Sequence, residues 1–289
     1  MDLRGAVALV TGASRGVGRA IALALAEAGA DVGCAARATD HNPRKLPGTI
    51  DATAHEVEAR GRRALAVPTD LSQPAEVEAM VARTVRHFGR LDVLVNNAAI
   101  TFPGDIDLAM KRWDLVMEVN LRAPVLAIKA ALPGMIARRR GAILNVSSAA
   151  SLMAVPGLLV YGVSKAGLER LTTGVAENVR SHGIAVNCLR IDVPIASEGF
   201  VHNAPELDKS DWEPTEVGAE GALWMLAQPP EFTGQVLGIT DLRRRRPPGP
   251  AAAAHRRDVA GRAEPVCGHD RVRDRSDLPL ARPGGGSRR

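Results

Sequence analysis

Aromatic residues and cysteines are scarce in this chain of 289 residues. It has four phenylalanines, three tryptophans and a single tyrosine, Tyr161. Its three cysteines, Cys34, Cys188 and Cys267, are odd in number and scattered, so they indicate neither a disulfide framework nor a metal cluster. We therefore expect no metal site and a reducing, cytoplasmic setting.

Long apolar runs are absent as well. No stretch of about 18 uncharged apolar residues occurs, which argues against a membrane span. The apolar run near the N-terminus is short and leads straight into a glycine-rich turn, so it predicts a first strand rather than a signal peptide. No membrane partner is expected.

The charge of the chain is distributed unevenly. Residues 243–289 hold 13 arginines, no lysine and five acidic residues, so their net charge is +8. Because the whole chain has a net charge of +5, residues 1–242 carry −3. The mildly acidic body gives no indication of a nucleic-acid surface. The tail is rich in Arg, Pro and Gly, and we expect it to be disordered because it cannot bury enough apolar surface to offset its chain entropy.

Two other interpretations of residues 243–289 stay open. One is a basic arm that binds nucleic acid or an acidic partner, although no aromatic residue is interleaved there for base stacking. The other is a frame-shifted reading of the gene, suggested by the abrupt change in composition after Ile239.

Apolar strands and helices alternate from residue 6 to about residue 240 without a linker. Such strands, buried on both faces, are typical of a parallel sheet covered by helices. The predicted fold class is α/β, a doubly wound parallel sheet (Rossmann fold), with one domain over residues 1–242 and a tail over 243–289. Strands are predicted at 6–11, 30–37, 64–70, 91–98, 142–149, 184–191 and 234–239, and helices at 19–28, 50–59, 74–88, 113–140, 160–181 and 217–227.

A glycine-rich turn, TGASRGVG from Thr11 to Gly18, follows the first predicted strand and opens a helix. Glycines permit a tight turn and close approach of a phosphate, which the free N–H groups of the helix N-terminus attract. The spacing is G-x-x-x-G-x-G rather than the common dinucleotide pattern G-x-G-x-x-G, and a plain strand–helix corner is the structural alternative. Its place directly after the first strand favours nucleotide binding.

The end of the second predicted strand bears on which nucleotide binds. A strand of an NAD-binding protein normally ends in Asp or Glu, which accepts from the ribose 2′-hydroxyl, whereas this strand ends in Arg37. Arg37 and Arg15 would pair with a 2′-phosphate, although both could be solvated surface residues. We therefore predict NADP rather than NAD. The long connection 38–48 carries Arg44 and Lys45, either as further phosphate contacts or as part of a plain surface loop.

The lone tyrosine stands four positions before a lysine, in the sequence YGVSK. On a helix, Tyr161 and Lys165 share one face. A free phenol has a pKa near 10, and a nearby ammonium lowers that pKa so that the phenol can exchange a proton near neutral pH. A half-buried tyrosine beside a solvated lysine is the structural alternative, and for an isolated Y-x-x-x-K pattern it would be preferred.

The pattern is not isolated, because the chain resembles the short-chain dehydrogenase/reductase family. The glycine turn, the strand end NNAA (Asn96 to Ala99), Asn120, the strand NVSS and YGVSK occur in family order and at family spacing. The resemblance spans about residues 3–240. As a set, these motifs are highly specific.

The resemblance implies roles for individual residues. Tyr161 would be the catalytic acid/base, and Lys165 would lower its pKa and bind the nicotinamide ribose. Ser148, rather than Ser147, would bind the substrate oxygen. Asn120 would hold a water of a proton relay. Asp70 and Leu71 would flank the adenine, and Asn97 and Ala98 would line the cofactor. The predicted cofactor-binding residues are Gly12, Ser14, Arg15, Gly16, Val17, Gly18, Arg37, Asp70, Leu71, Asn97, Ala98, Tyr161, Lys165 and Val193.

The chain departs from the family pattern in the segment after the sixth strand. The family usually shows Pro-Gly there, next to the nicotinamide carboxamide, whereas this chain has Ile191-Asp192-Val193-Pro194. Pro194 has no N–H to donate, and Asp192 could be structural or face the substrate. Residues 194–214 are expected to cover the substrate. Phe200, Leu207 and Trp212 are either its apolar anchors or residues that pack this cover against the body of the domain, and packing is preferred for Trp212.

The sequence thus predicts an NADP-dependent oxidoreductase that acts on an alcohol, ketone or aldehyde of moderate hydrophobicity. The alternative is an NADP-binding Rossmann protein with little catalysis, which acts as a regulatory or interaction partner. The resemblance also implies a homodimer or homotetramer built on the later helices.

Overall fold

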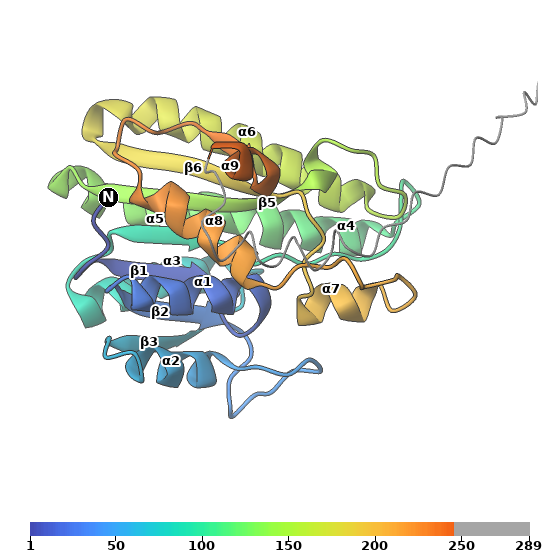
Figure 1. Cartoon of the computed structure of the whole chain (residues 1–289), viewed down its shortest axis with the longest axis horizontal. Helices are drawn as coiled ribbons and strands as arrows, with labels where there is room; N and C mark the ends of the chain where they lie inside the picture. The colour runs from blue at the N-terminus through green and yellow to red at the C-terminus, as the bar shows by residue number, and fades with distance from the viewer. Residues whose placement is uncertain (246–289) are drawn as a thin grey trace, which may run out of the picture. The chain divides into compact units, whose positions relative to one another are not determined.

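The computed structural model describes residues 1–245, and the predicted disorder of the tail from residue 246 onward lies outside the described residues. Seven parallel strands form one sheet in the order β3-β2-β1-β4-β5-β6-β7 (Figure 1). The strands are β1 (Val7–Thr11), β2 (Asp31–Ala36), β3 (Ala64–Pro68), β4 (Val93–Asn96), β5 (Gly141–Ser148), β6 (Ile184–Ile191) and β7 (Val236–Gly238).

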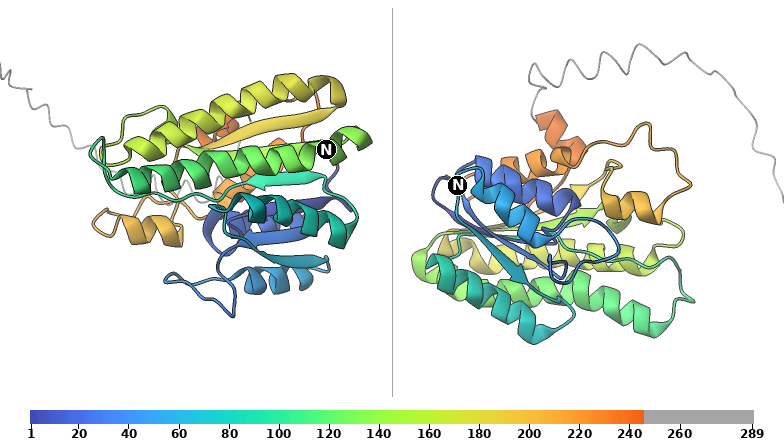
Figure 2. Two further views of the ribbon diagram at one scale, coloured as in Figure 1. Left: turned by 180° about the vertical axis from the view of Figure 1, so that it is seen from behind. Right: turned by 90° about the horizontal axis from the view of Figure 1, so that it is seen from below.

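Helices cover both faces of the sheet (Figure 2). In β1, Ala8 and Val10 join the core beneath α1, α2 and α8, whereas Val7 and Leu9 join the core beneath α3, α5 and α6. This alternation confirms the doubly wound fold. The helices are α1 (Gly16–Glu27), α2 (Ile50–Glu58), α3 (Pro74–Phe88), α4 (Met110–Met117), α5 (Ala123–Arg138), α6 (Leu159–Val179), α7 (Glu198–Asn203), α8 (Glu216–Ala227) and α9 (Ile239–Arg245).

The strand order reverses between β1 and β4. From β1 the chain proceeds through β2 to β3 on one side, then returns to build β4 to β7 on the other. In open α/β sheets, ligands bind outside the carboxyl ends of the strands at such a switch point. The glycine turn after β1, Asn97 after β4 and Ser148 at the end of β5 all stand at this edge.

Two elements differ from the sequence prediction. The single helix expected over 113–140 is divided, because the π-helical turn Glu118–Arg122 separates α4 from α5. The chain was expected to be irregular after Ile239, but residues 239–245 form the helix α9, and its Leu242 is buried in the core. Arginines therefore belong to the ordered domain as far as Arg245. Within residues 1–245, no helix combines the length and hydropathy that a membrane span requires.

Candidate active site

The glycine turn has the backbone that the motif predicts. Gly12 and Gly16 have φ values of +69° and +57°, a region that residues with a Cβ adopt reluctantly. At Gly18 the constraint is contact, since a Cβ would lie 2.3 Å from the main-chain oxygen of Gly12 and 2.3 Å from Nδ2 of Asn97. The turn therefore packs too tightly for side chains at these positions, and it leaves the N-terminus of α1 open to a phosphate.

Asn97 and Ala98 are tied to the turn through Thr11. The Nδ2 of Asn97 donates to the main-chain oxygen of Thr11 at 2.9 Å, and the N–H groups of Asn97 and Ala98 donate to Thr11 Oγ1 at 3.0 and 3.1 Å. The ends of β1 and β4 are thus held side by side. Ala99, which stands where the family usually has glycine, is exposed, so its methyl group has room.

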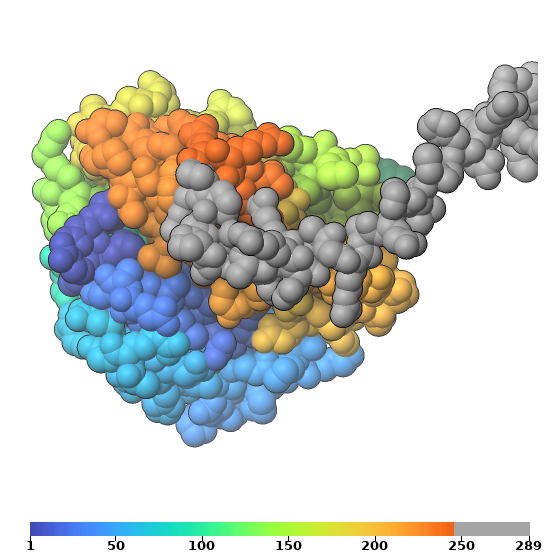
Figure 3. All heavy atoms as spheres, in the orientation of Figure 1, coloured from blue at the N-terminus to red at the C-terminus, as the bar shows by residue number. Residues whose placement is uncertain are grey.

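The long connection between β2 and α2 is fastened to the glycine turn. The Arg15 guanidinium donates from Nε to Pro47 O at 2.6 Å and from Nη2 to Leu46 O at 2.8 Å and Gly48 O at 3.1 Å. Thr53 adds a bond from its hydroxyl to Ala13 O at 2.8 Å. In the space-filling view this loop reaches the neighbourhood of α7 (Figure 3). Arg15 therefore commits two of its guanidinium nitrogens, Nε and Nη2, to carbonyl groups of this loop.

Two other arginines lie near the predicted adenosine end of the site. Burial raises the pKa of Asp70, but hydrogen bonds from Ser72 and the charges of Arg37 and Arg44 outweigh burial and lower it overall. The N–H and hydroxyl of Ser72 donate to Asp70 Oδ1 at 3.0 and 2.8 Å. Arg37 is exposed at the end of β2, and Arg44 comes from the β2–α2 loop. Both cations are close enough to Asp70 to influence its ionisation.

Tyr161 stands in the first turn of α6, next to Ser148 at the end of β5. The phenol is half-buried and hydrogen-bonded to Ser148. Burial raises the pKa of Tyr161, and the bond with Ser148 only partly offsets this effect. The phenol is therefore neutral at pH 7 and has a proton to give.

Lys165 is buried one helical turn after Tyr161. Its side chain is 2% exposed, and Nζ donates to the main-chain oxygen of Val146 at 2.8 Å. Burial lowers the pKa of Lys165 to about 8, against the opposing influence of Cys188 and Glu169. Lys165 is thus mostly an ammonium at pH 7, beside the phenol that it shares a helix face with.

Asn120 lies in the π-helical turn Glu118–Arg122 and is fully buried. Its Oδ1 accepts from the N–H of Ile100 at 2.8 Å, while Nδ2 donates to Ile100 O at 2.9 Å and to Ser164 Oγ at 3.1 Å. The side chain therefore joins the segment after β4 to α6. Because π-helical turns often occur at functional sites, the position of this turn beside α6, the helix of Tyr161 and Lys165, supports a functional site there.

Comparison with known proteins supports the motif assignment. The family model described as short chain dehydrogenase matches residues 6–193. The chain belongs to the short-chain dehydrogenase family. It is 36% identical over 244 residues to a hydroxysteroid dehydrogenase-like protein 2 of Danio rerio, which covers 83% of this chain but only 58% of that protein. The chain thus spans little more than half the length of that relative.

Two further similarities are informative. A 3-oxoacyl-(acyl-carrier-protein) reductase of Staphylococcus aureus is 41% identical over 184 residues, which cover 63% of this short-chain dehydrogenase and 72% of the reductase. The crystal structure of a metagenomic short-chain oxidoreductase in complex with NADP has a TM-score of 0.69 and 33% identity. That match covers 82% of this chain and 98% of the other.

The segment that departs from the family pattern is structural at Asp192. In this short-chain dehydrogenase Asp192 Oδ1 accepts from the N–H of Thr240 at 3.2 Å, and Oδ2 accepts from the Thr240 hydroxyl. A Cβ on Gly238 would lie 2.2 Å from Asp192 Oδ2. Of the two roles open to Asp192, the structure therefore shows a contact with the start of α9. Val193 and Pro194 follow it into the segment 194–214.

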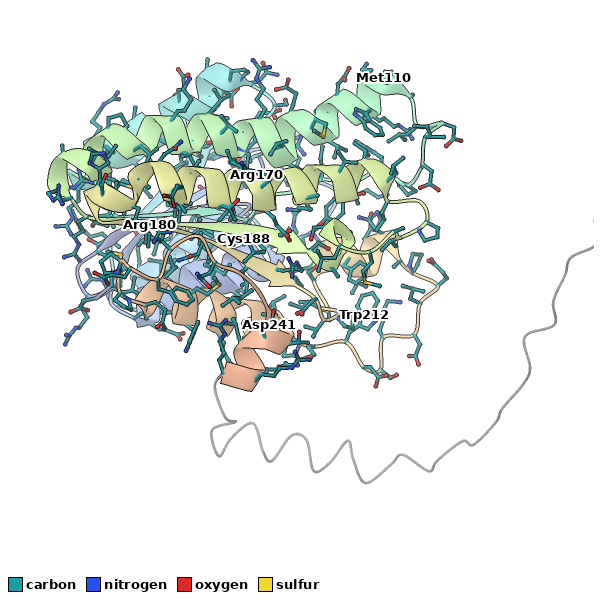
Figure 4. The ribbon with its side chains drawn as sticks, turned by 90° about the horizontal axis from the view of Figure 1, so that it is seen from above. Met110, Arg170, Arg180, Cys188, Trp212 and Asp241 are labelled. Atoms are coloured by element: carbon teal, nitrogen blue, oxygen red, sulfur yellow. The ribbon has the colours of Figure 1, made fainter. Side chains whose placement is uncertain are left out.

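The segment 194–214, which the sequence predicts as the substrate cover, is held at both ends. Its start rests on the glycine turn, since a Cβ on Gly16 would lie 3.2 Å from Ser197 Cβ. Glu213 pairs with Arg243 of α9, with Nη1 2.8 Å from Oε1. The rings of Phe200 and Trp212 are stacked with centroids 4.4 Å apart, so Trp212, which is labelled in Figure 4, packs on another residue of the same segment.

The sequence analysis missed Glu169 and Arg190, which form a largely buried ion pair with Nη2 2.7 Å from Oε2. One signal was present, because Glu169 follows Lys165 by one helical turn and so shares the face of Tyr161. Arg190 is near the end of β6, and its pairing with α6 depends on the tertiary fold. Among residues 1–245, no group of three or more His, Cys, Asp or Glu side chains is arranged to hold a metal ion.

Proposed function

We propose that this short-chain dehydrogenase is an oxidoreductase that moves a hydride between NADP(H) and a carbonyl/alcohol pair, with Tyr161 as general acid/base. The observation that carries the proposal is the group formed by Tyr161, Ser148 and buried Lys165 at the carboxyl edge of the sheet. Burying an ammonium is unfavourable, and ionisable groups with perturbed pKa values concentrate at functional sites.

The protein's part in the reaction is to position the substrate and handle a proton. Bound nicotinamide supplies the hydride in reduction and accepts it in oxidation. Neutral Tyr161 donates its proton to the carbonyl oxygen, which also accepts from the Ser148 hydroxyl. The Lys165 ammonium then stabilises the phenolate that remains. Because three hydrogen bonds already hold the Asn120 side chain, we assign the relay water to the main chain of its π-helical turn.

The residues present fit a nicotinamide dinucleotide. A turn that excludes Cβ atoms at Gly12, Gly16 and Gly18 leaves main-chain N–H groups free for the pyrophosphate. Lys165 would bind the nicotinamide ribose, and Asp70 the adenine. The remaining predicted contacts, Ser14, Val17, Leu71, Asn97, Ala98 and Val193, are carried over from the family pattern.

NADP is the cofactor that the charges favour. No carboxylate ends β2, and the cations Arg37 and Arg44 both act on Asp70. Guanidinium groups bind phosphate through charge-assisted hydrogen bonds. Since Arg15 gives three bonds to loop carbonyls, its main part in the proposal is to hold the loop that carries Arg44, while Arg37 binds the 2′-phosphate.

The substrate class is an alcohol, ketone or aldehyde of moderate hydrophobicity. Leu152 and Met153, which follow the Ser148 strand, are exposed, as are Leu159 beside Tyr161 and Phe200 and Leu207 of the cover. Exposed apolar side chains gathered near a site are suited to contact an apolar ligand. The phenol among them supplies the polar end of the site.

The first test is a fluorescence titration of the protein with NADPH and NADH, followed by a turnover screen over ketones, aldehydes and alcohols. We expect NADPH to bind more tightly than NADH and turnover to depend on Tyr161. Tyr161→Phe should lower kcat by about a thousandfold or more while NADPH still binds, because it removes the proton donor but not the cofactor contacts.

Three outcomes would contradict parts of this proposal. Retained turnover in Tyr161→Phe would remove Tyr161 from the mechanism. Tight NADPH binding with no turnover in the screen would favour a regulatory NADP-binding protein. Failure of both nucleotides to bind would refute the oxidoreductase function for this chain.

We also propose a cytoplasmic protein that assembles as a homodimer or homotetramer through its later helices. The location is supported by two free, buried cysteines, Cys34 and Cys188, and the assembly by the family resemblance. Light scattering after gel filtration would measure the oligomeric state, and a monomeric mass would contradict the assembly.

A further inference from the structure

The carboxylate of Glu169 collects hydrogen bonds from three segments of the chain. Its Oε1 accepts from Ser147 Oγ at 2.7 Å, Ser151 Oγ at 2.6 Å and Arg190 Nε at 2.9 Å. Its Oε2 accepts from Arg190 Nη2 at 2.7 Å. The end of β5, the turn that follows it and β6 are therefore all joined to α6 through one side chain.

These contacts bracket Ser148. Ser147 precedes it at the end of β5, and Ser151 ends the short 3-10 turn Ala149–Ser151 that follows. Both hydroxyls are bound to the same oxygen of Glu169, two helical turns after Tyr161 on α6. The residues on both sides of Ser148 are thus tied to α6, the helix of the phenol, by a single carboxylate.

Glu169 also supplies negative charge next to Lys165. Burial raises the pKa of Glu169, but the bonds from Arg190, Ser151 and Ser147 and the charge of Arg190 outweigh burial and lower it overall, so the group is ionised at pH 7. Burial raises the pKa of Cys188 to about 12, so its thiol is neutral at pH 7.

Of the ionisable groups that act on Lys165, Glu169 is the one that is negatively charged at pH 7. Tyr161 on α6 is neutral at pH 7, and Arg190 on β6 is paired with Glu169. Figure 4 labels Cys188 on β6, a strand that packs against α6. β5 contributes the uncharged Val146 O, and among residues 1–245 the ionisable groups that act on the pKa of Lys165 are Cys188 and Glu169.

We propose that Glu169, held by Arg190, is a positioning residue for the reaction, which fixes Ser148 against Tyr161 and keeps Lys165 charged. The inference rests on the proposed function, since it assigns Glu169 an effect on that same set of residues. Glu169 is not in contact with the reacting atoms and acts only through Ser148 and Lys165.

A purely structural ion pair is the alternative, and it predicts a different pattern among variants. Breaking a buried pair from either side destabilises a protein by a similar amount, because one charge is left without its partner. If the pair only supports the fold, Glu169→Gln and Arg190→Met should behave alike. If Glu169 acts on Lys165, only Glu169→Gln should affect the lysine, since Arg190→Met retains the anion and both serine bonds.

The direct experiment is a pH titration of Lys165 by NMR in protein labelled with 13C at lysine. The chain has only five lysines, and Lys165→Met identifies the resonance. We expect Glu169→Gln to lower the pKa of Lys165 by about one unit, a tenfold loss of proton affinity, because its anion is removed. Arg190→Met should leave that pKa unchanged or raise it. Glu177→Gln removes an exposed carboxylate from the same helix and should have no effect.

Kinetics give the second readout. With NADPH and the best ketone from the turnover screen, we expect Glu169→Gln to lower kcat about tenfold, with the alkaline limb of its pH profile moved to lower pH. The Kd for NADPH should stay within about twofold of the wild type, because no cofactor contact is lost. Arg190→Met should retain most of the wild-type kcat.

Equal effects of Glu169→Gln and Arg190→Met on the Lys165 titration would overturn the inference, as would no effect of either. The titration needs no substrate, so it can fail or succeed independently of the turnover screen. Loss of the proposed function would instead appear as turnover that survives Tyr161→Phe. The two results are therefore distinguishable.

Discussion

Lys165 Nζ lies 5.6 Å from the centroid of the Tyr161 ring and donates its hydrogen bond to Val146 O. The ammonium is thus directed at the main chain of β5 while it stays near the phenol. Below its pKa of about 8, the lysine therefore places a positive charge beside the phenol.

Because Tyr161 is the only tyrosine, its ionisation can be followed by ultraviolet difference absorbance without interference from another phenol. The pKa of Lys165 is about 8 and burial raises that of Tyr161 above its usual value near 10, so the lysine is neutral before the phenol ionises. We therefore expect Lys165→Met to leave the midpoint of the Tyr161 titration nearly unchanged, as should the matched control Lys129→Met at an exposed position on α5. A midpoint that rises in Lys165→Met alone would show that the lysine stays charged until the phenol ionises.

The buried ammonium should destabilise the fold at neutral pH. The pKa of Lys165 falls from 10.5 to about 8 on folding, so the unfolded chain binds more protons between these values. The free energy of unfolding should therefore increase as pH rises from 8 to 10.5, because folding then no longer requires a buried ammonium at Lys165. Lys165→Met should stabilise the protein at pH 7 by about 1 to 3 kcal/mol, with a smaller gain at pH 10.

Urea unfolding of Lys165→Met and Lys129→Met at pH 7 and pH 10 measures this difference. The lysine on α5 should give nearly no change at either pH. A Lys165→Met protein that is less stable than the wild type at pH 7 would show that the bond to Val146 O outweighs the burial of charge.

Cofactor preference should depend on Arg37. Replacing it by glutamate removes a phosphate partner and adds a carboxylate of the kind that binds a ribose 2′-hydroxyl. We expect Arg37→Glu to weaken NADPH binding about tenfold to a hundredfold, in line with the loss of a charge-assisted hydrogen bond, and to leave NADH binding unchanged or improved. Fluorescence titration measures both constants.

Arg86→Glu, an exposed charge reversal on α3, is the control for the overall change in charge and should affect the two nucleotides equally. If Arg37→Glu weakens NADPH and NADH by the same factor, the arginine does not bind the 2′-phosphate.

The two hydrogen bonds from Thr240 to Asp192 should hold α9 in place. Asp192→Ala leaves the N–H and hydroxyl of Thr240 without their acceptor, so we expect a loss of about 1 to 3 kcal/mol in unfolding free energy. Amide hydrogen exchange should accelerate in residues 239–245 and in the Glu213 segment that Arg243 contacts. Asp192→Asn retains one carbonyl acceptor and should recover part of the protection. Unchanged exchange in Asp192→Ala would show that burial of Leu242 alone fixes α9.

Elements whose stability comes from their own pattern could be predicted from the sequence. The strand expected at 184–191 is β6 with the same bounds, because its apolar side chains are buried on both faces. The helix α9 could not be predicted, since its arginine-rich sequence is fixed by Asp192 and Glu213, which lie 48 and 30 residues away. The same holds for Arg190 and Glu169, whose pairing depends on how β6 meets α6.

The site followed a similar division. The positions of Tyr161, Lys165 and Ser148 could be located from spacing, because a helix and a neighbouring strand end bring them together. The use of the Arg15 donors could not, because it depends on how the β2–α2 loop folds back onto the glycine turn.

The π-helical turn Glu118–Arg122 contains one residue more than an α-helical turn would, in the middle of an otherwise continuous helical stretch. Deleting one residue there would restore α-helical pairing and rotate everything on one side of the deletion by about 100° relative to the other. Either Asn120 would leave its contacts with Ile100 and Ser164, or the buried face of α5 would turn away from the sheet. The length of this helical stretch should therefore vary less among functional descendants of this chain than its amino-acid composition, and single-residue deletions in it should be rarer than substitutions.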